Sequence, residues 1–174
     1  MPNLPDPILW AIPGFILLVI AEMIYGRLTG KTRFEPRDTA ASLVMGLGNT
    51  VSGLVLGGIV VAWFVFVEQF ALLDIGWAWY WFVIAFVLDD FVYYWSHRFA
   101  HTVRWFWADH VVHHSSQHYN LTTALRQPWF GPFTGLYILG LPMVILGFHP
   151  YLIGFAAGWN LLYQFWIHTE AINR

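Results

Sequence analysis

Long apolar runs constrain this chain more than any other feature of its sequence. A helix that crosses a bilayer needs about 17–25 apolar residues, and five runs qualify: 8–25, 40–67, 77–94, 129–148 and 151–167. Hydrophobic residues make up 58% of the chain and charged residues only 10%, whereas soluble domains carry about 25% charged residues. Backbone polar groups in lipid must be satisfied within their own segment, so these runs should be helical. The sequence predicts one all-α integral membrane domain over residues 1–174, with four to five transmembrane helices.

The cationic side chains indicate a multi-pass orientation. If the N-terminus lies outside and the chain crosses five times, all eight Lys and Arg residues fall on one side of the membrane: Arg27, Lys31, Arg33, Arg37, Arg98, Arg104, Arg126 and Arg174. The positive-inside rule makes that side cytoplasmic. A helical cap is expected there over residues 98–128. The net charge of -2 argues against nucleic acid as a partner, because phosphate binding needs a basic surface.

Histidines are concentrated at the end of the third run and just beyond it. His97 and His101 share one helical face because they are four residues apart, and residues 110–114 repeat this spacing as HxxHH. A further pair, Gln164 and His168, ends the fifth run on the same side. One histidine on a polar segment means little, but this spacing beside a membrane span predicts a metal site. Six histidines are its expected metal ligands and catalytic residues: His97, His101, His110, His113, His114 and His168. The remaining two, His118 and His149, are expected outside it.

The ligand type narrows the choice of metal. Imidazole suits Zn, Cu, Fe and Ni, and six histidines indicate two metals. Two irons with open coordination positions can activate dioxygen, and zinc is an alternative occupant of the isolated protein. Asp90, two turns before His97, and Gln164 are expected to hydrogen-bond to ligand imidazoles and fix their tautomers.

The motifs resemble those of the fatty acid hydroxylase / sterol desaturase superfamily. Residues 90–101, DFVYYWSHRFAH, are similar to its first histidine box, and residues 110–127, HVVHHSSQHYNLTTALRQ, to its second box and the stretch that follows. Residues 160–170, NLLYQFWIHTE, resemble the alkylglycerol monooxygenase branch most closely. The resemblance is detailed over the histidine-box region, residues 90–174, and looser over the earlier spans.

The resemblance implies a membrane-bound di-iron enzyme that uses O2 to oxidise a C–H bond of a membrane lipid. In the branch named, it implies ether-lipid cleavage with tetrahydrobiopterin as reductant. An alternative within the fold is a sterol, fatty acid or carotenoid hydroxylase or desaturase supplied by electron-transfer proteins. Outside the enzymes, a bis-histidine membrane cytochrome and a metal transporter are the alternatives.

This chain differs from the family pattern in two ways that bear on the activity and the metal ligands implied by the resemblance. Animal members of the branch have Glu after the second histidine of the first box, and this chain has Thr102, which bears on pterin dependence. The family also continues to a third HxxHH box, whereas this chain ends at Arg174. The expectation is therefore a domain truncated at its C-terminus, with an incomplete set of ligands and little or no turnover by itself.

Overall fold

The computed structural model describes residues 4–172, and within them it contains helices and loops but no strands. The predicted all-α class is therefore confirmed. The long helices are α1 (Pro7–Thr29), α2 (Pro36–Glu68), α3 (Trp79–Thr102) and α7 (Pro150–Phe165). The short ones are α4 (Arg104–His110), η1 (His113–Ser115), η2 (Thr123–Leu125), α5 (Gly131–Thr134), η3 (Leu136–Gly140) and α6 (Leu141–Leu146).

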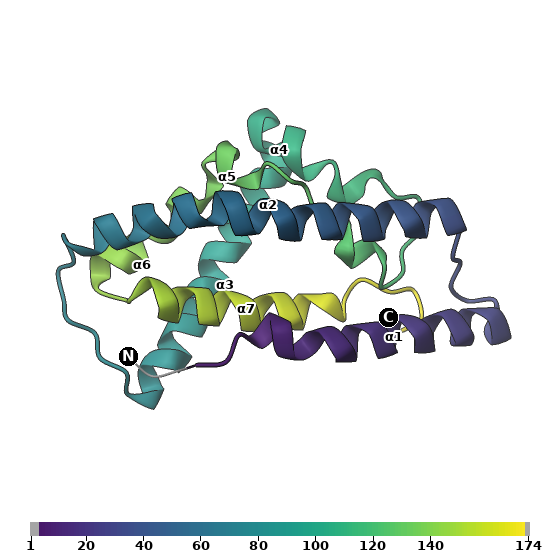
Figure 1. The fold of residues 1–174 in the computed structure, drawn as a ribbon, viewed down its shortest axis with the longest axis horizontal. Coiled ribbons are helices and arrows are strands. Elements are labelled where there is room, and N and C mark those ends of the chain that lie inside the picture. The colour runs from purple at the N-terminus through teal and green to yellow at the C-terminus, as the bar shows by residue number, and fades with distance from the viewer. Residues whose placement is uncertain (1–3, 173–174) are drawn as a thin grey trace.

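Three long helices run side by side along the molecule, and α3 is inclined across them (Figure 1). α1 and α7 point the same way, and α2 points the opposite way (Figure 1). Local chemistry fixes where they begin. Asp6 accepts the backbone N–H of Ile8 at 2.9 Å and so caps α1, and the Nδ1 of His149 accepts that of Tyr151 at 3.0 Å and caps α7. A proline follows each cap, where its missing N–H costs no helical hydrogen bond.

The apolar core is small and lies where α3, α6 and α7 meet. Ala85, Val144, Leu152 and Ala156 are almost completely buried there. By contrast, α1 and α2 leave most of their apolar surface uncovered: Leu28 is 81% exposed and Leu54 80%. These two helices are long and apolar enough to cross a membrane. Because they are not buried in protein, they are not the core helices of a soluble fold, and the chain is a membrane protein.

The fourth apolar run does not form the continuous helix that the sequence predicts. Residues 129–148 are divided among α5, η3 and α6. Gly135 and Gly147 adopt the left-handed backbone conformation, with φ of 81° and 109°, which ends a right-handed helix. Pro132 and Pro142 stand in the first turns of α5 and α6, because proline cannot continue the preceding helical hydrogen bonds. Apolarity alone did not reveal these interruptions.

The expected cap is also less helical than predicted. Of residues 98–128, the end of α3, α4 and two 3-10 turns are helical, and the rest is loop. The other two long helices are weaker candidates for membrane spans than α1 and α2. α3 carries two adjacent carboxylates, Asp89 and Asp90, and α7 has only 16 residues.

Two sets of loops lie at opposite ends of the long helices (Figure 1). At one end the α1–α2 loop meets the cap, where Asn120 Nδ2 donates to the carbonyl of Arg33 at 2.8 Å. At the other end His149 Nε2 lies 3.7 Å from a Glu68 carboxylate oxygen. His149 is thus remote from the other histidines. Arg174, one of the eight cations, lies outside the described residues.

The side chain of Trp129, just before α5, packs directly against the backbone of α2. Trp129 Nε1 donates to the carbonyl of Met45 at 3.0 Å, and its indole ring lies over Gly48. A Cβ at Gly48 would stand 2.2 Å from that ring, whereas one at Gly53 would meet nothing within 4 Å. Gly48 is therefore required for this contact.

We expect Gly48→Ala to destabilise the protein, because the added methyl displaces Trp129. Overpacking costs about 1–3 kcal/mol, or roughly 2–12 °C in Tm for a chain of this size. Gly53→Ala is the matched control, since both changes raise helix propensity equally. Thermal unfolding in detergent, followed by Trp fluorescence, measures the difference. Equal Tm values for the two variants would contradict the assigned contact.

Candidate metal centre

The end of α3 presents two imidazoles to one point. His97 and His101 lie one turn apart, and their Nε2 atoms are 3.0 Å from each other. Tyr93, a turn before His97, has its hydroxyl 2.8 Å from His97 Nδ1. Hydrogen bonding at Nδ1 fixes the orientation of a ring and leaves Nε2 for a metal.

The second box brings two more imidazoles to the same point. His110 ends α4 and His114 lies in η1, and their Nε2 atoms are 3.2 Å apart. One nitrogen from each of His97, His101, His110 and His114 lies within 4.8 Å of the others. Nitrogens bound to one tetrahedral metal at about 2.0–2.1 Å lie roughly 3.3–3.4 Å apart. The two facing pairs are close to that spacing, so this four-histidine group fits a metal ion.

The other two of the six predicted ligands, His113 and His168, form a separate pair. His113 Nε2 lies 3.1 Å from His168 Nε2. His113 Nδ1 lies 3.1 Å from the carbonyl oxygen of Arg126, and His168 Nδ1 lies 2.8 Å from that of Gln164. A carbonyl only accepts, so each Nδ1 carries its proton and each neutral ring turns a lone pair toward the other. A metal ion in contact with both nitrogens would remove the repulsion between these lone pairs, so the histidine pair also fits a metal.

Desolvation favours the neutral form of the three second-box imidazoles and of His168. Desolvation, and then the neighbouring His97 and His114, lowers the pKa of His110 to about 3. Desolvation lowers the pKa of His113 to about 4, although its bond to the Arg126 carbonyl opposes the shift. The pKa values of His114 and His168 are also lowered, mainly by desolvation. A neutral imidazole has a free lone pair at pH 7, which is the form that binds metals.

A buried ion pair supports the carbonyl that orients His113. Arg126 Nη2 lies 2.7 Å from a carboxylate oxygen of Asp38 in α2, and both side chains are largely buried. The same guanidinium donates to Ser42 at 3.1 Å and to Ser115 at 3.0 Å. Ser116 donates to the second oxygen of Asp38 at 2.8 Å. The second box is thus fastened to α2, a contact between residues 88 positions apart that no sequence spacing indicates.

α1 supports the cap through one buried carboxylate. Glu22 accepts the backbone N–H of Leu121 at 2.7 Å, and the hydroxyl of Thr169 donates to its other oxygen. One side chain therefore joins the stretch after the second box to the segment that follows His168. Sequence reasoning missed this residue as well, although a lone carboxylate within an apolar run is a signal for a polar contact.

Of the two residues expected to hydrogen-bond to ligand imidazoles, Gln164 contacts one and Asp90 contacts none among the described residues. Among the described residues, no histidine hydrogen-bonds to Asp90, and the group at His97 Nδ1 is Tyr93. Gln164 contacts His168 through its backbone carbonyl, while its side chain donates to Asn160 at 2.8 Å. Asn160 in turn donates to Asp89 at 3.2 Å. The i, i+4 spacing from Tyr93 to His97 was the available signal for the correct partner.

A cavity of about 530 Å³ opens beside the histidines, between α3, α7 and the second-box loop. His97, His113, His114 and His168 line it, as do Asp90 and Gln164. His118 is part of its wall too, although its only hydrogen bonds among the described residues go through its backbone. The histidine groups therefore face a space large enough for part of a small molecule.

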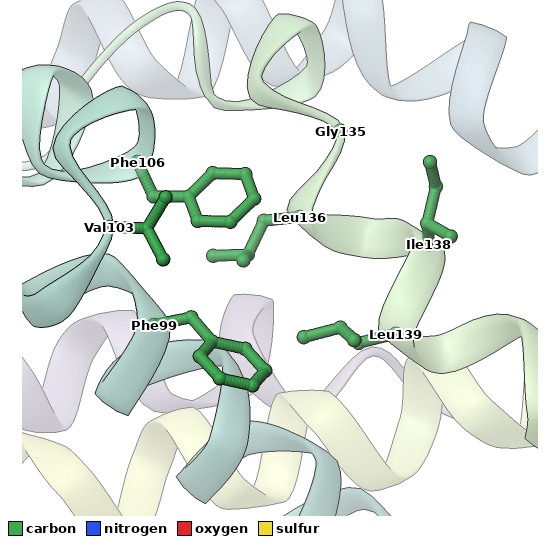
Figure 2. A pocket seen from close by; sticks show the side chains of 7 residues that line it. All are labelled: Phe99, Val103, Phe106, Gly135, Leu136, Ile138 and Leu139. Carbon is green, nitrogen blue, oxygen red and sulfur yellow. The ribbon is translucent and has the colours of Figure 1, made fainter.

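A second cavity, of about 340 Å³, lies on the opposite side of α3. Figure 2 shows its apolar side chains, with Phe99, Val103 and Phe106 facing Leu136 and Leu139. Phe99 lies between His97 and His101 in the sequence, and so on the far face of the same helix. This cavity lies behind the histidines, and its apolar lining contains no side chain that could bind a metal.

Comparisons with known proteins agree with the motifs. Alkylglycerol monooxygenases of Danio rerio and Homo sapiens are each 37% identical over 174 residues, which cover 98% of this chain and 39% of theirs. That of Caenorhabditis elegans is 31% identical over 118 residues, 65% of this chain and 23% of its own. The chain thus spans about two-fifths of the length of the first two. No solved structure matches it. Residues 82–174, more than half of the chain, match the fatty acid hydroxylase family, and the chain belongs to that family.

Proposed function

We propose that this chain forms the metal- and lipid-binding part of a membrane monooxygenase that acts on ether lipids. The observation that carries the proposal is the set of facing imidazole nitrogens, above all His113 and His168, whose lone pairs oppose each other at 3.1 Å. The relatives named alkylglycerol monooxygenase support the substrate class. Without a cation between the rings, the paired acceptors would repel each other.

Six histidines would hold two irons. The four-histidine group would bind one and the histidine pair His113–His168 the other, with further ligands from elsewhere; zinc would fit the same imidazoles in the isolated protein. Iron, when bound, supplies the activation of dioxygen. One oxygen atom enters the C–H bond beside the ether oxygen, and the other leaves as water. A reductant, either tetrahydrobiopterin or an electron-transfer protein, would supply the two electrons, and the two protons that form water would come with them or from solvent.

The chain's own residues would orient the imidazoles and enclose the head of the lipid. Arg126 and Gln164 fix the two imidazoles of the histidine pair through their carbonyl groups, and Tyr93 fixes His97. The cavity would hold the lipid head against these rings. Once a lipid fills this cavity, water would be displaced from the reacting bond, which strengthens polar interactions there.

The proposal also includes the full topology. α3 and α7 would cross the membrane beside α1 and α2, residues 129–148 would return the chain to the far end as a broken segment alongside α2, and the histidines would face the cytoplasm. Support comes from the one-sided cations and from the grouping of the α1–α2 loop with the cap (Figure 1). The polar chain Asp89–Asn160–Gln164 faces protein rather than lipid, as polar groups in membrane helices do.

Cysteine labelling in intact cells tests this orientation. The chain has no native cysteine, so Lys31→Cys and Gln117→Cys report the proposed cytoplasmic end, and Leu72→Cys reports the other end. We expect a membrane-impermeant maleimide to label position 72 alone. Labelling at 31 and 117, with none at 72, would reverse the orientation.

Oxygen uptake tests the activity. The 174-residue chain and the longest product of its gene are loaded with iron in nanodiscs and supplied with reductant and 1-O-hexadecylglycerol. We expect lipid-dependent uptake in any form that holds two irons, and no uptake in a form that holds fewer. An oxygen electrode, together with iron analysis, makes the measurement. Two bound irons without lipid-dependent uptake, or no iron in any form, would contradict the proposal.

His113→Ala provides the matched test of the site within an active form. Removing this ligand should abolish uptake, whereas membrane insertion should be unaffected because His113 lies outside the apolar helices. His149→Asn is the control, since Asn retains the helix cap at the far end of the molecule. Equal activity of the two variants would exclude His113 from the site.

A further inference from the structure

One carboxylate in the wall of the 530 Å³ cavity has no partner. Asp90 lies in α3 and is exposed to the cavity. Within residues 4–172 it forms neither a hydrogen bond nor an ion pair. Its neighbour Asp89 differs, because it is buried and accepts a hydrogen bond from Asn160 at 3.2 Å. Asp89 therefore holds α3 to α7, whereas Asp90 is free to contact a ligand.

An unpaired carboxylate in this place calls for an explanation. Asp90 follows a long apolar stretch of α3, WYWFVIAFVL. Ionisable residues in such helices are costly and face an aqueous cavity or a polar partner. Nothing in the fold requires Asp90, since it supports no described side chain. Its role is then to be sought in what enters the cavity.

The position of Asp90 relative to the histidines sets the size of that partner. Asp90 precedes His97 by two helical turns, which is roughly 10 Å along the helix axis. A glycerol unit spans roughly 6 Å when extended, and a hydrogen bond adds about 2.7 Å. A glycerol head bound to Asp90 would thus bring its ether linkage to the histidines. Tyr163 and Ile167, 67% and 59% exposed, line the same cavity and offer an apolar exit for an alkyl chain.

The neighbouring groups favour hydroxyls over a cationic head. Gln164, Tyr93 and Tyr94 line the cavity together with Asp90. Their amide and hydroxyl groups can both donate and accept hydrogen bonds. A hydroxyl also donates and accepts, whereas an ammonium group only donates. Arg98, hydrogen-bonded to the Tyr94 hydroxyl at 3.0 Å, also lines the cavity and would repel a cation.

We propose that Asp90 accepts hydrogen bonds from the free hydroxyl groups of a glycerol ether lipid, and so selects lipids whose glycerol hydroxyls are unmodified. The inference rests on the proposed function and names the part of the substrate that this residue recognises. Asp90 is a specificity residue that contacts the lipid head, distinct from the imidazoles that would hold metal.

Equilibrium binding without reductant tests the proposal, because no turnover occurs. Tritiated 1-O-hexadecylglycerol is bound to the full chain in nanodiscs and displaced by unlabelled 1-O-hexadecylglycerol or its 2,3-di-O-methyl ether. We expect the unmodified diol to bind about tenfold tighter or more, as for hydrogen bonds to a charged acceptor. Equal displacement by both lipids, or no saturable binding, would overturn the proposal.

Variants assign the selectivity to the residue. Asp90→Leu should bind both lipids equally, and Asp90→Asn should keep only part of the preference. Asp90→Leu removes a charge from a membrane helix, so its insertion should not suffer. The control Asp74→Asn, in the exposed loop at the far end of the molecule, should behave as wild type. An unchanged preference in Asp90→Leu would overturn the proposal.

The two proposals fail separately. A preserved diol preference in a form that binds two irons but shows no lipid-dependent oxygen uptake would refute the proposed function and leave the role of Asp90 standing. Lipid-dependent oxygen uptake in Asp90→Leu, with its diol preference unchanged, would refute the role of Asp90 alone.

Discussion

The opposed lone pairs of His113 and His168 are the interaction on which the rest of the site depends. Each ring is held by a backbone carbonyl at Nδ1, so neither can turn its Nε2 away without losing a hydrogen bond. The nitrogens lie 3.1 Å apart, and two acceptors at that distance repel each other unless a cation lies between them. Desolvation lowers the pKa of both His113 and His168, which disfavours an additional proton shared by the two rings. A metal ion fits this position better.

Maintaining this arrangement explains polar contacts that would otherwise be unfavourable near a membrane. The Arg126–Asp38 ion pair is largely buried, and burying charges is costly unless their hydrogen bonds are satisfied. Here Ser42, Ser115 and Ser116 satisfy them. Glu22 acts similarly from α1, where it holds the cap and the segment after His168 together. α1 and α2 therefore position the loops that carry the imidazoles.

Local periodicity in the sequence predicted much of the histidine arrangement. The i, i+4 pairs at 97/101 and 110/114 indicated shared faces, and the structure has their Nε2 atoms 3.0 and 3.2 Å apart. Apolar length predicted where α1 and α2 lie, although α1 ends four residues later and α2 begins four residues earlier than the apolar runs. The break of residues 129–148 was not foreseen, because glycine conformation and proline placement outweighed hydropathy there. Long-range partners such as Asp38 and Arg126 were also missed, because they depend on how distant segments pack. Asp90 was taken for a partner of histidine, although the hydroxyl of Tyr93 fills that place.

X-ray absorption at the iron edge of the iron-loaded chain tests the central claim most directly. If the facing imidazoles hold metal, the spectrum will show nitrogen neighbours at about 2.0–2.2 Å with the outer-shell scattering typical of imidazole rings. His168→Ala should reduce that outer-shell scattering and the iron content together. A spectrum with oxygen neighbours alone, or one that does not change when His168 is removed, would contradict the account.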